Sequence, residues 1–188
     1  PKEGENIVLA IDTRVQEQLF MKIREVVETR GFQGGAGVIM IVETGEVLAL
    51  TSAPEYNSQA LTDGVGEAIE EFLNDKDNPF LSRATAGLYA PGSIVKPIVA
   101  VAALQEQLIS PEEKILSTGS ISIPNPYFPG KESIFRDWKA HGWVDMREAL
   151  AVSSDVYFYE VGGGYEERKG LGIGKLETYM KLFGFGRA

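Results

Sequence analysis

The chain has 188 residues, of which 44% are hydrophobic and 24% charged, enough for an ordinary globular core. Its formal net charge of −9 argues against nucleic acid and anionic membrane surfaces as partners. The absence of cysteine and the presence of one histidine exclude disulfides, thiol nucleophiles and multi-histidine metal sites. They also argue against a Ser-His-Asp triad.

The first half of the sequence predicts a strand, a helix and a β-hairpin. The strand is expected over residues 7–12, and the helix from a cap at Thr13 to about Thr29, where apolar residues recur at helical spacing. Two β-branched runs, 36–42 and 46–51, flank a turn and predict the hairpin. Nothing catalytic is evident in this hairpin. A less regular stretch follows, with a further helix expected over 61–73.

The middle of the chain carries the sequence Y-A-P-G-S-I-V-K-P, from Tyr89 to Pro97, followed by an apolar run to Leu108. The Pro-Gly pair predicts a loop, with a buried helix starting near Ser93. Lys96 then lies one turn after Ser93 on the same helix face. A serine becomes nucleophilic when a neighbour takes its proton, and an amine shielded from water can do so. The helix N-terminus adds N–H groups for an oxyanion. The spacing alone is a weak signal, because serine at a helix start is commonly only a cap.

The stretch 117–140 predicts loops with short strands. His141 follows between two tryptophans, an arrangement more typical of a packed, hydrogen-bonded residue than of a catalytic one. Asp145, with a glutamate three residues later, predicts a capped helix that ends near Val152.

Two serines and an acid, Ser153, Ser154 and Asp155, come next and lead into an aromatic run. They are interpreted either as a site or as a helix cap at Asp155, and the sequence alone favours the cap. A final helix is expected over 176–183.

Two motifs, Tyr89–Pro97 and Ser153–Tyr159, together resemble those of the transpeptidase domain of class B penicillin-binding proteins. The resemblance covers essentially the whole chain and is greatest to the elongation-type penicillin-binding protein 2 branch. It implies an α+β fold, the penicillin-binding protein/serine β-lactamase-like transpeptidase fold, in which helices pack around an antiparallel sheet. Further agreement lies in the segments 36–57, 135–142, 170–173 and 183–186.

The resemblance implies a peptidoglycan D,D-transpeptidase that uses neither a cofactor nor a metal. Ser93 is then the nucleophile that attacks the penultimate D-Ala carbonyl of a stem peptide, and Lys96 is the base that activates it. Ser153 relays protons to the leaving amine. Asp155 helps to hold Lys96 and the substrate, which Ser153 also binds. β-Lactams acylate the same serine.

Two departures from the family pattern stand out. The second motif usually ends in Asn, whereas here it ends in Asp155, a carboxylate that stabilises a lysine ammonium and so opposes a neutral base. The third motif, K-T-G, does not occur after residue 155. We therefore expect residues 1–188 to be a partial, N-terminal portion of the domain, with that motif beyond the end of the chain. We expect the chain alone to be inactive or impaired.

The resemblance also implies partners and a location. The partners are D-Ala-D-Ala stem peptides, β-lactam antibiotics, proteins of cell-wall elongation, and either a second chain or the missing part of the domain; nucleic acid is not among them. The location is the outer face of a bacterial cytoplasmic membrane, with an anchor upstream of this sequence. Two alternatives stay open: a class D-like β-lactamase or β-lactam sensor, and a non-catalytic scaffold of the elongation machinery.

Overall fold

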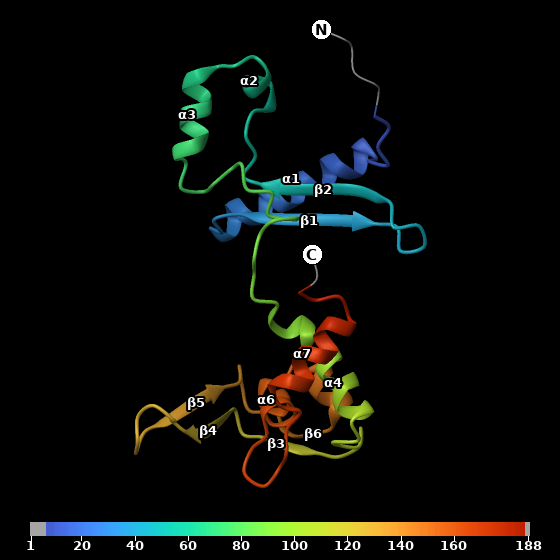
Figure 1. The fold of residues 1–188 in the computed structure, drawn as a ribbon, viewed down its shortest axis with the longest axis vertical. Helices are drawn as coiled ribbons and strands as arrows, with labels where there is room; N and C mark the ends of the chain where they lie inside the picture. Colours follow the sequence, from blue (N-terminus) through green and yellow to red (C-terminus); the bar gives the residue numbers. More distant parts are fainter. Residues whose placement is uncertain (1–6, 187–188) are drawn as a thin grey trace. The chain divides into compact units, whose positions relative to one another are not determined.

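The structure, a computed structural model, describes residues 7–186. The chain divides into two compact units, residues 1–89 (unit 1) and 90–188 (unit 2), coloured blue to green and green to red in Figure 1. Both units combine helices with short antiparallel sheets, in agreement with the expected α+β class. Within 7–186, no helix has the length and apolar character needed to cross a membrane.

Unit 1 is built on one helix and one hairpin. Helix α1 spans Thr13–Arg30, and strands β1 (Gly35–Met40) and β2 (Val47–Ala53) pair antiparallel. The helix begins one residue earlier than predicted, because Asp12 rather than Thr13 is its N-cap and accepts a hydrogen bond from the Arg14 N–H. The predicted strand at 7–12 is wrong: these residues form no strand, although the Asp12 N–H donates one hydrogen bond to the Leu48 carbonyl of β2 at 3.0 Å.

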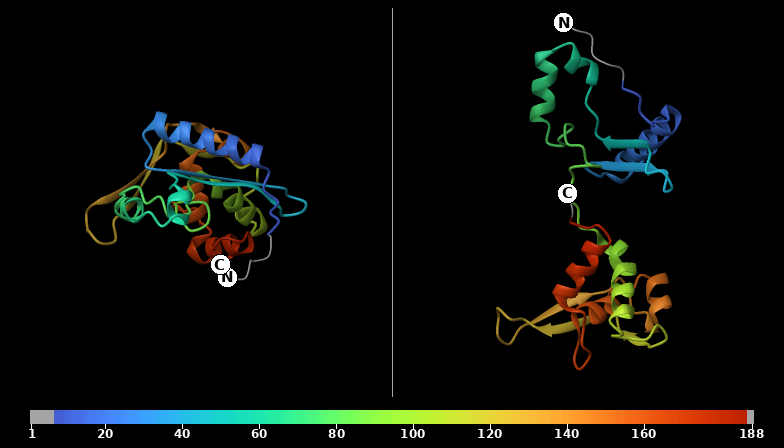
Figure 2. Two further views of the ribbon diagram at one scale, coloured as in Figure 1. Left: turned by 90° about the horizontal axis from the view of Figure 1, so that it is seen from above. Right: turned by 45° about the vertical axis from the view of Figure 1, so that its right-hand side comes forward.

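Helix α1 packs on the hairpin through glycines of β1 (Figure 2). A Cβ at Gly35 would lie 2.9 Å from an Ile23 methyl, and one at Gly37 would lie 3.0 Å from Leu19. The missing side chains therefore let the apolar face of the helix approach the sheet. Gln16 adds two hydrogen bonds to the Leu50 backbone, at 2.9 and 2.8 Å, which fix the helix against β2.

The rest of unit 1 holds two short helices, α2 (Ser58–Thr62) and α3 (Gly66–Asn74). The single helix predicted over 61–73 is therefore wrong. Gly64 lies between the two helices, and its left-handed backbone, with φ +68°, separates the end of α2 from the start of α3.

Unit 2 begins with the 3₁₀ turn η1 (Gly92–Val95), which runs directly into helix α4 (Lys96–Gln105). Two small antiparallel pairs follow, β3 with β6 and β4 with β5. Strands β4 and β5 lie within the stretch 117–140 where short strands were predicted, whereas β3 and β6 lie at its two ends, mostly outside it. Helix α5 has the predicted capping box of Asp145 and Glu148. The remaining elements are β3 (Ile115–Ser117), β4 (Ser120–Pro124), β5 (Glu132–Arg136), β6 (Gly142–Val144), α5 (Met146–Ala151), α6 (Asp155–Gly163) and α7 (Gly172–Leu182).

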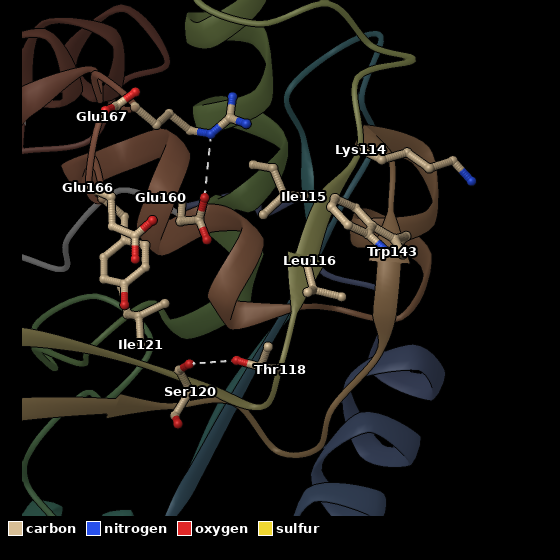
Figure 3. A pocket seen from close by; sticks show the side chains of 12 residues that line it. Lys114, Ile115, Leu116, Thr118, Ser120, Ile121, Trp143, Glu160, Glu166 and Glu167 are labelled. Carbon is tan, nitrogen blue, oxygen red and sulfur yellow. Dashed lines mark hydrogen bonds and ion pairs between the residues drawn. The ribbon is translucent and has the colours of Figure 1, made fainter.

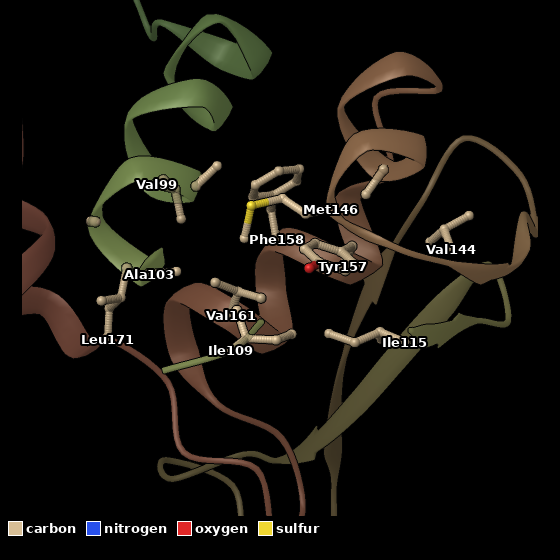
Figure 4. Close-up of a cluster of buried hydrophobic side chains, with 13 residues drawn as sticks. Val99, Ala103, Ile109, Ile115, Val144, Met146, Tyr157, Phe158, Val161 and Leu171 are labelled. Carbon is tan, nitrogen blue, oxygen red and sulfur yellow. The ribbon is translucent and has the colours of Figure 1, made fainter. Parts of the chain in front are cut away.

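Helices α4, α6 and α7 pack around one hydrophobic core (Figure 4). Helix α6 is apolar nearly all round because it lies in the middle of this unit, with Val156, Tyr157 and Val161 fully buried. The N-terminal ends of α4 and α6 carry the two sequence motifs. The core that joins these helices therefore fixes the motifs relative to each other. Its members are Val99, Ala100, Ala102, Ala103, Ile109, Ile115, Val144, Met146, Ala149, Tyr157, Phe158, Val161 and Leu171.

Candidate active site

Lys96 is the centre of the candidate site. It is the first residue of α4, and its side chain is only 8% exposed although it carries an amine. Val99, Ala100 and Ala103 lie on the same helix face as Lys96 and are all buried, so the face that carries the lysine stem packs into unit 2. A buried lysine needs partners for its head group, because an unpaired ammonium in a dry site is very costly.

Helix α6 and the turn before it supply those partners. Lys96 Nζ donates to the Ser153 carbonyl oxygen at 2.7 Å, to Ser153 Oγ at 3.0 Å and to Asp155 Oδ1 at 2.6 Å. These three acceptors match the three donors of an ammonium group. The structure therefore brings together three of the four predicted residues, from segments nearly sixty positions apart, and Lys96 is arranged as the charged form.

Ser93 lies in the 3₁₀ turn just before the lysine. Its carbonyl accepts the Lys96 backbone N–H, so one tight turn separates the two residues. The Ser93 residue is exposed, and its hydroxyl takes no part in the three bonds of the Lys96 head group. The serine is therefore accessible to a ligand, while the lysine behind it is shielded.

The turn that carries Ser153 has an unusual backbone. Ser153 has φ +55°, a left-handed conformation that L residues other than Asn and Asp seldom adopt. The N-cap of α6 is Ser154, whose hydroxyl accepts the Tyr157 N–H, and not Asp155 as the cap interpretation expected. Asp155 is thereby left free of capping and bonds Lys96 instead.

Asp137 is a residue that the sequence reasoning did not single out. Its side chain is fully buried, and its Oδ2 accepts the Ser154 hydroxyl at 2.9 Å and the Val156 N–H at 3.0 Å. Burial opposes its ionisation, but the hydrogen bonds from Val156, Ser154 and the Trp138 N–H outweigh burial and hold the pKa of Asp137 below its ordinary value. No short-range pattern marks it, because its partners lie 17 and 19 residues away.

His141 is packed, as preferred for it, but it is not the hydrogen-bonded residue that was expected, because neither ring nitrogen has a hydrogen-bond partner among the described residues. Its side chain is 2% exposed, stacks edge-on against Trp138 at 5.0 Å between centroids, and lies 3.4 Å from Asp137. A side chain so enclosed is not placed to reach a substrate. Within 7–186, no group of three or more His, Cys, Asp or Glu side chains is arranged to hold a metal ion.

A separate pocket on unit 2 is lined from β3, β6, α6 and the loop after α6 (Figure 3). It holds Glu160, which pairs with Arg168 at 3.4 Å and whose pKa is raised by burial. None of the four predicted site residues lines it. It contains carboxylates and Trp143, but no serine beside a buried amine, so it lacks the chemistry for acyl transfer.

Known proteins resemble this chain along nearly its whole length. A family model described as the penicillin binding protein transpeptidase domain matches residues 35–188. The peptidoglycan D,D-transpeptidase MrdA of Haemophilus influenzae is 38% identical over 186 residues, which are 97% of this chain and 26% of that protein.

Two solved structures add a fold comparison. Pseudomonas aeruginosa PBP2 in complex with WCK 5153 is 32% identical with a TM-score of 0.69, over 96% of this chain and 38% of that one. The complex between PBP2 and MreC from Helicobacter pylori is 32% identical with a TM-score of 0.68, over 87% of this chain and 29% of that one.

These matches confirm the predicted transpeptidase fold and the likeness to penicillin-binding protein 2. The chain spans about a quarter of the length of the curated relative, 26%. The family match covers well over half of this sequence, from residue 35 to residue 188. The chain thus belongs to the penicillin-binding protein transpeptidase domain family.

Proposed function

We propose that this chain carries the nucleophile half of a peptidoglycan D,D-transpeptidase site. The observation that carries the proposal is the buried Lys96, held by Ser153 and Asp155 one turn after the exposed Ser93. A serine becomes a nucleophile when a neighbouring amine takes its proton, and a lysine one turn after the serine is spaced to do so.

The four residues receive separate roles in this proposal. Ser93 Oγ attacks the penultimate D-Ala carbonyl of a stem peptide, the terminal D-Ala leaves, and an acyl-enzyme forms. Lys96 takes the Ser93 proton. Ser153 Oγ passes its proton to the leaving amine and receives the proton held by Lys96, 3.0 Å away, and Ser153 and Asp155 also contact the substrate. The amine of a second stem peptide then attacks the acyl-enzyme and forms the cross-link.

The charge state of Lys96 sets a condition on this sequence of steps. An ammonium has no lone pair, so Lys96 must give up one proton before it can accept another from Ser93. Among its three acceptors Asp155, 2.6 Å away, is the only carboxylate, and it stabilises the ammonium that must lose this proton. The proton therefore passes from Lys96 to solvent before Ser93 attacks, and Asp155 opposes this step where the usual Asn would not.

The proposal includes residues outside this sequence. The K-T-G segment that the family places beside the serine is absent here, and it would supply the second oxyanion donor and bind the substrate carboxylate. We propose that residues 1–188 form part of a transpeptidase domain that a further segment or a second chain completes. On this basis the chain alone turns over stem peptides slowly or not at all.

The setting follows from the relatives. One of them is a D,D-transpeptidase and another is in complex with MreC, so we propose an elongation protein of this kind as a partner. The proposed location is the outer face of the cytoplasmic membrane, with an anchor from outside this sequence. β-Lactams are the proposed inhibitors, because they acylate the same kind of serine.

The test measures products from a donor and an acceptor stem peptide, with this chain and with a version extended through a K-T-G segment. The proposal expects released D-Ala and a cross-linked dimer from the extended protein, and neither from its Ser93→Ala variant. Rapid hydrolysis of penicillin without cross-linking would make it a β-lactamase. A folded extended protein that binds penicillin without covalent attachment would leave the scaffold alternative.

A further inference from the structure

The turn that presents Ser153 and Asp155 is held from two sides. Its odd-numbered residues, 153 and 155, bond Lys96. Its even-numbered residues bond the segment Asp137–Trp138. Trp138 Nε1 donates to the Val152 carbonyl at 3.1 Å, and the Ser154 hydroxyl and Val156 N–H donate to Asp137 Oδ2 at 2.9 and 3.0 Å.

The Asp137 carboxylate is itself rigidly placed. It follows the last residue of β5, and its backbone N–H donates to the Gly119 carbonyl at 2.9 Å. Its other oxygen accepts the Trp138 N–H at 2.8 Å, and the side chain is sealed from water. A fully buried carboxylate with several donors is costly to move, because each lost bond leaves a charge unpaired.

The backbone of the turn needs such an anchor. Ser153 adopts φ +55°, which L residues keep only where the surroundings fix it. This conformation lets both the carbonyl and the hydroxyl of one residue face the same ammonium. Backbone N–H groups of Ser153 and Ser154 donate to the Leu150 and Ala149 carbonyls at 3.2 and 2.8 Å, and the bonds from Asp137 and Trp138 to residues 152, 154 and 156 hold the turn from the opposite side.

We propose that Asp137, together with Trp138, is a positioning residue that fixes residues 152–156 so that Ser153 and Asp155 meet Lys96. This inference rests on the proposed function for its kinetic consequence, but its structural claim stands apart from it. The hydrogen bonds and the ion pair of the Asp137 side chain go to Ser117, Trp138, His141, Ser154 and Val156, and none goes to Lys96. Asp137 acts indirectly, through its hydrogen bonds to Ser154 and Val156 of the turn.

The first part of the test compares four proteins: the parent chain, Asp137→Asn, Asp155→Asn and the matched control Glu160→Gln. Glu160 lies on α6, as Asp155 does, and its carboxylate is only 12% exposed. It pairs with Arg168 and makes no bond to the turn 152–156, so it is a control for loss of a carboxylate elsewhere on this helix. The first readout is the ¹⁵N–¹H resonance of the Lys96 ammonium, which is visible when hydrogen bonds slow its exchange with water. It is expected in the parent and in Glu160→Gln, and is expected to vanish in Asp155→Asn and Asp137→Asn.

The second readout is the rate of acylation by penicillin in the extended protein. Asp137→Asn should slow it about 10²-fold, since small misplacements of catalytic groups have effects of that size. The double variant Asp137→Asn/Asp155→Asn should be acylated less than about threefold more slowly than Asp155→Asn alone. Trp138→Phe, which removes one exposed N–H donor and leaves a smaller aromatic ring, should show a weaker loss even where Asp137→Asn fails to fold.

The outcomes separate the two claims. A Lys96 resonance that persists in a folded Asp137→Asn, or acylation at the parent rate in both that variant and Trp138→Phe, overturns the positioning role. Fully multiplied losses in the double variant also overturn it, because independent effects indicate a general structural role. An extended protein that shows the resonance but is never acylated refutes the proposed function and leaves the positioning role supported.

Discussion

The two units differ in how they use their apolar residues. Unit 2 buries thirteen residues in one cluster between its helices. In unit 1, helix α1 has no buried residue, and Val38, Ile39 and Met40 of β1 are 46, 38 and 54% exposed. All four predicted site residues belong to unit 2. The comparison teaches that the candidate chemistry is built where the core can hold a buried charge in place.

The largest expected effect contrasts two lysines. Replacing Lys96 by Ala should slow acylation of Ser93 about 10³-fold in the extended protein, because it removes the proposed base. Replacing Lys22 by Ala, on α1 with a side chain 72% exposed, should leave the rate unchanged. Stopped-flow measurements with a fluorescent penicillin provide both rates. Equal rates in the two variants would mean that Lys96 is not the base.

The next effect contrasts two valines with the same chemistry. Val161→Ala in unit 2 removes a fully buried side chain and should lower the free energy of unfolding by about 2 kcal/mol. Val38→Ala in unit 1, at 46% exposure, should change it by less than about 0.5 kcal/mol. Urea unfolding of both variants measures the difference. A larger loss from Val38→Ala would show that the hairpin, not the helical core, holds the chain together.

A smaller effect concerns an unpaired hydroxyl inside the core of unit 2. Tyr157 is fully buried, its hydroxyl has no hydrogen-bond partner among the described residues, and burial raises its pKa to about 12. Tyr157→Phe keeps the ring and removes the unsatisfied group, so it should raise the free energy of unfolding by about 1 kcal/mol. Thermal unfolding checks this, and a clear destabilisation would reveal a partner for the hydroxyl.

The smallest expected effect is the response of two carboxylate pKa values to salt. Asp12 of unit 1 has its pKa lowered to about 2, mainly by hydrogen bonds from Arg14, whose side chain is 89% exposed. Asp137 of unit 2 is fully buried among donors that are mostly neutral. At about 1 M salt the midpoint of Asp12 should therefore rise towards 3.8, while that of Asp137 should stay below its ordinary value.

The sign of the pH dependence follows for both groups. Each has a folded-state pKa below its unfolded value, so its stabilisation is present above about pH 4 and is lost as the pH falls through the folded-state pKa. NMR titration of the two carboxyl groups measures both midpoints, with Arg14→Ala as the control for Asp12. A salt-sensitive Asp137 would contradict its sealed environment.

Local signals in the sequence predicted the elements that are governed by local physics. Helix α1 and helix α5 follow from apolar spacing and a capping box, and the hairpin follows from two β-branched runs around a turn. The strand predicted over residues 7–12 is wrong because an apolar, β-branched run forms a strand only where a neighbouring strand pairs with it. The helix over 61–73 failed because Gly64 interrupts it.

The candidate site likewise has residues that the sequence could predict and contacts that depend on how the helices pack. Ser93 and Lys96 could be proposed from spacing in one turn, and the family resemblance added Ser153 and Asp155. The bonds from Lys96 to the second motif depend on how α4 packs against α6, which the sequence shows only as two apolar helices. Asp137 was not singled out for the same reason, because its role depends on hydrogen-bond donors, Ser154 and Val156, that only the fold brings next to it.

The central claim is that Ser93 is a nucleophile activated by Lys96. Intact-mass spectrometry after incubation with a penicillin tests it most directly, with the parent chain, its extended version and Ser93→Ala of each. The account predicts one penicilloyl adduct on the extended protein, mapped to Ser93 by peptide sequencing and absent from Ser93→Ala. No adduct on a folded extended protein, or an adduct that survives Ser93→Ala, would contradict it.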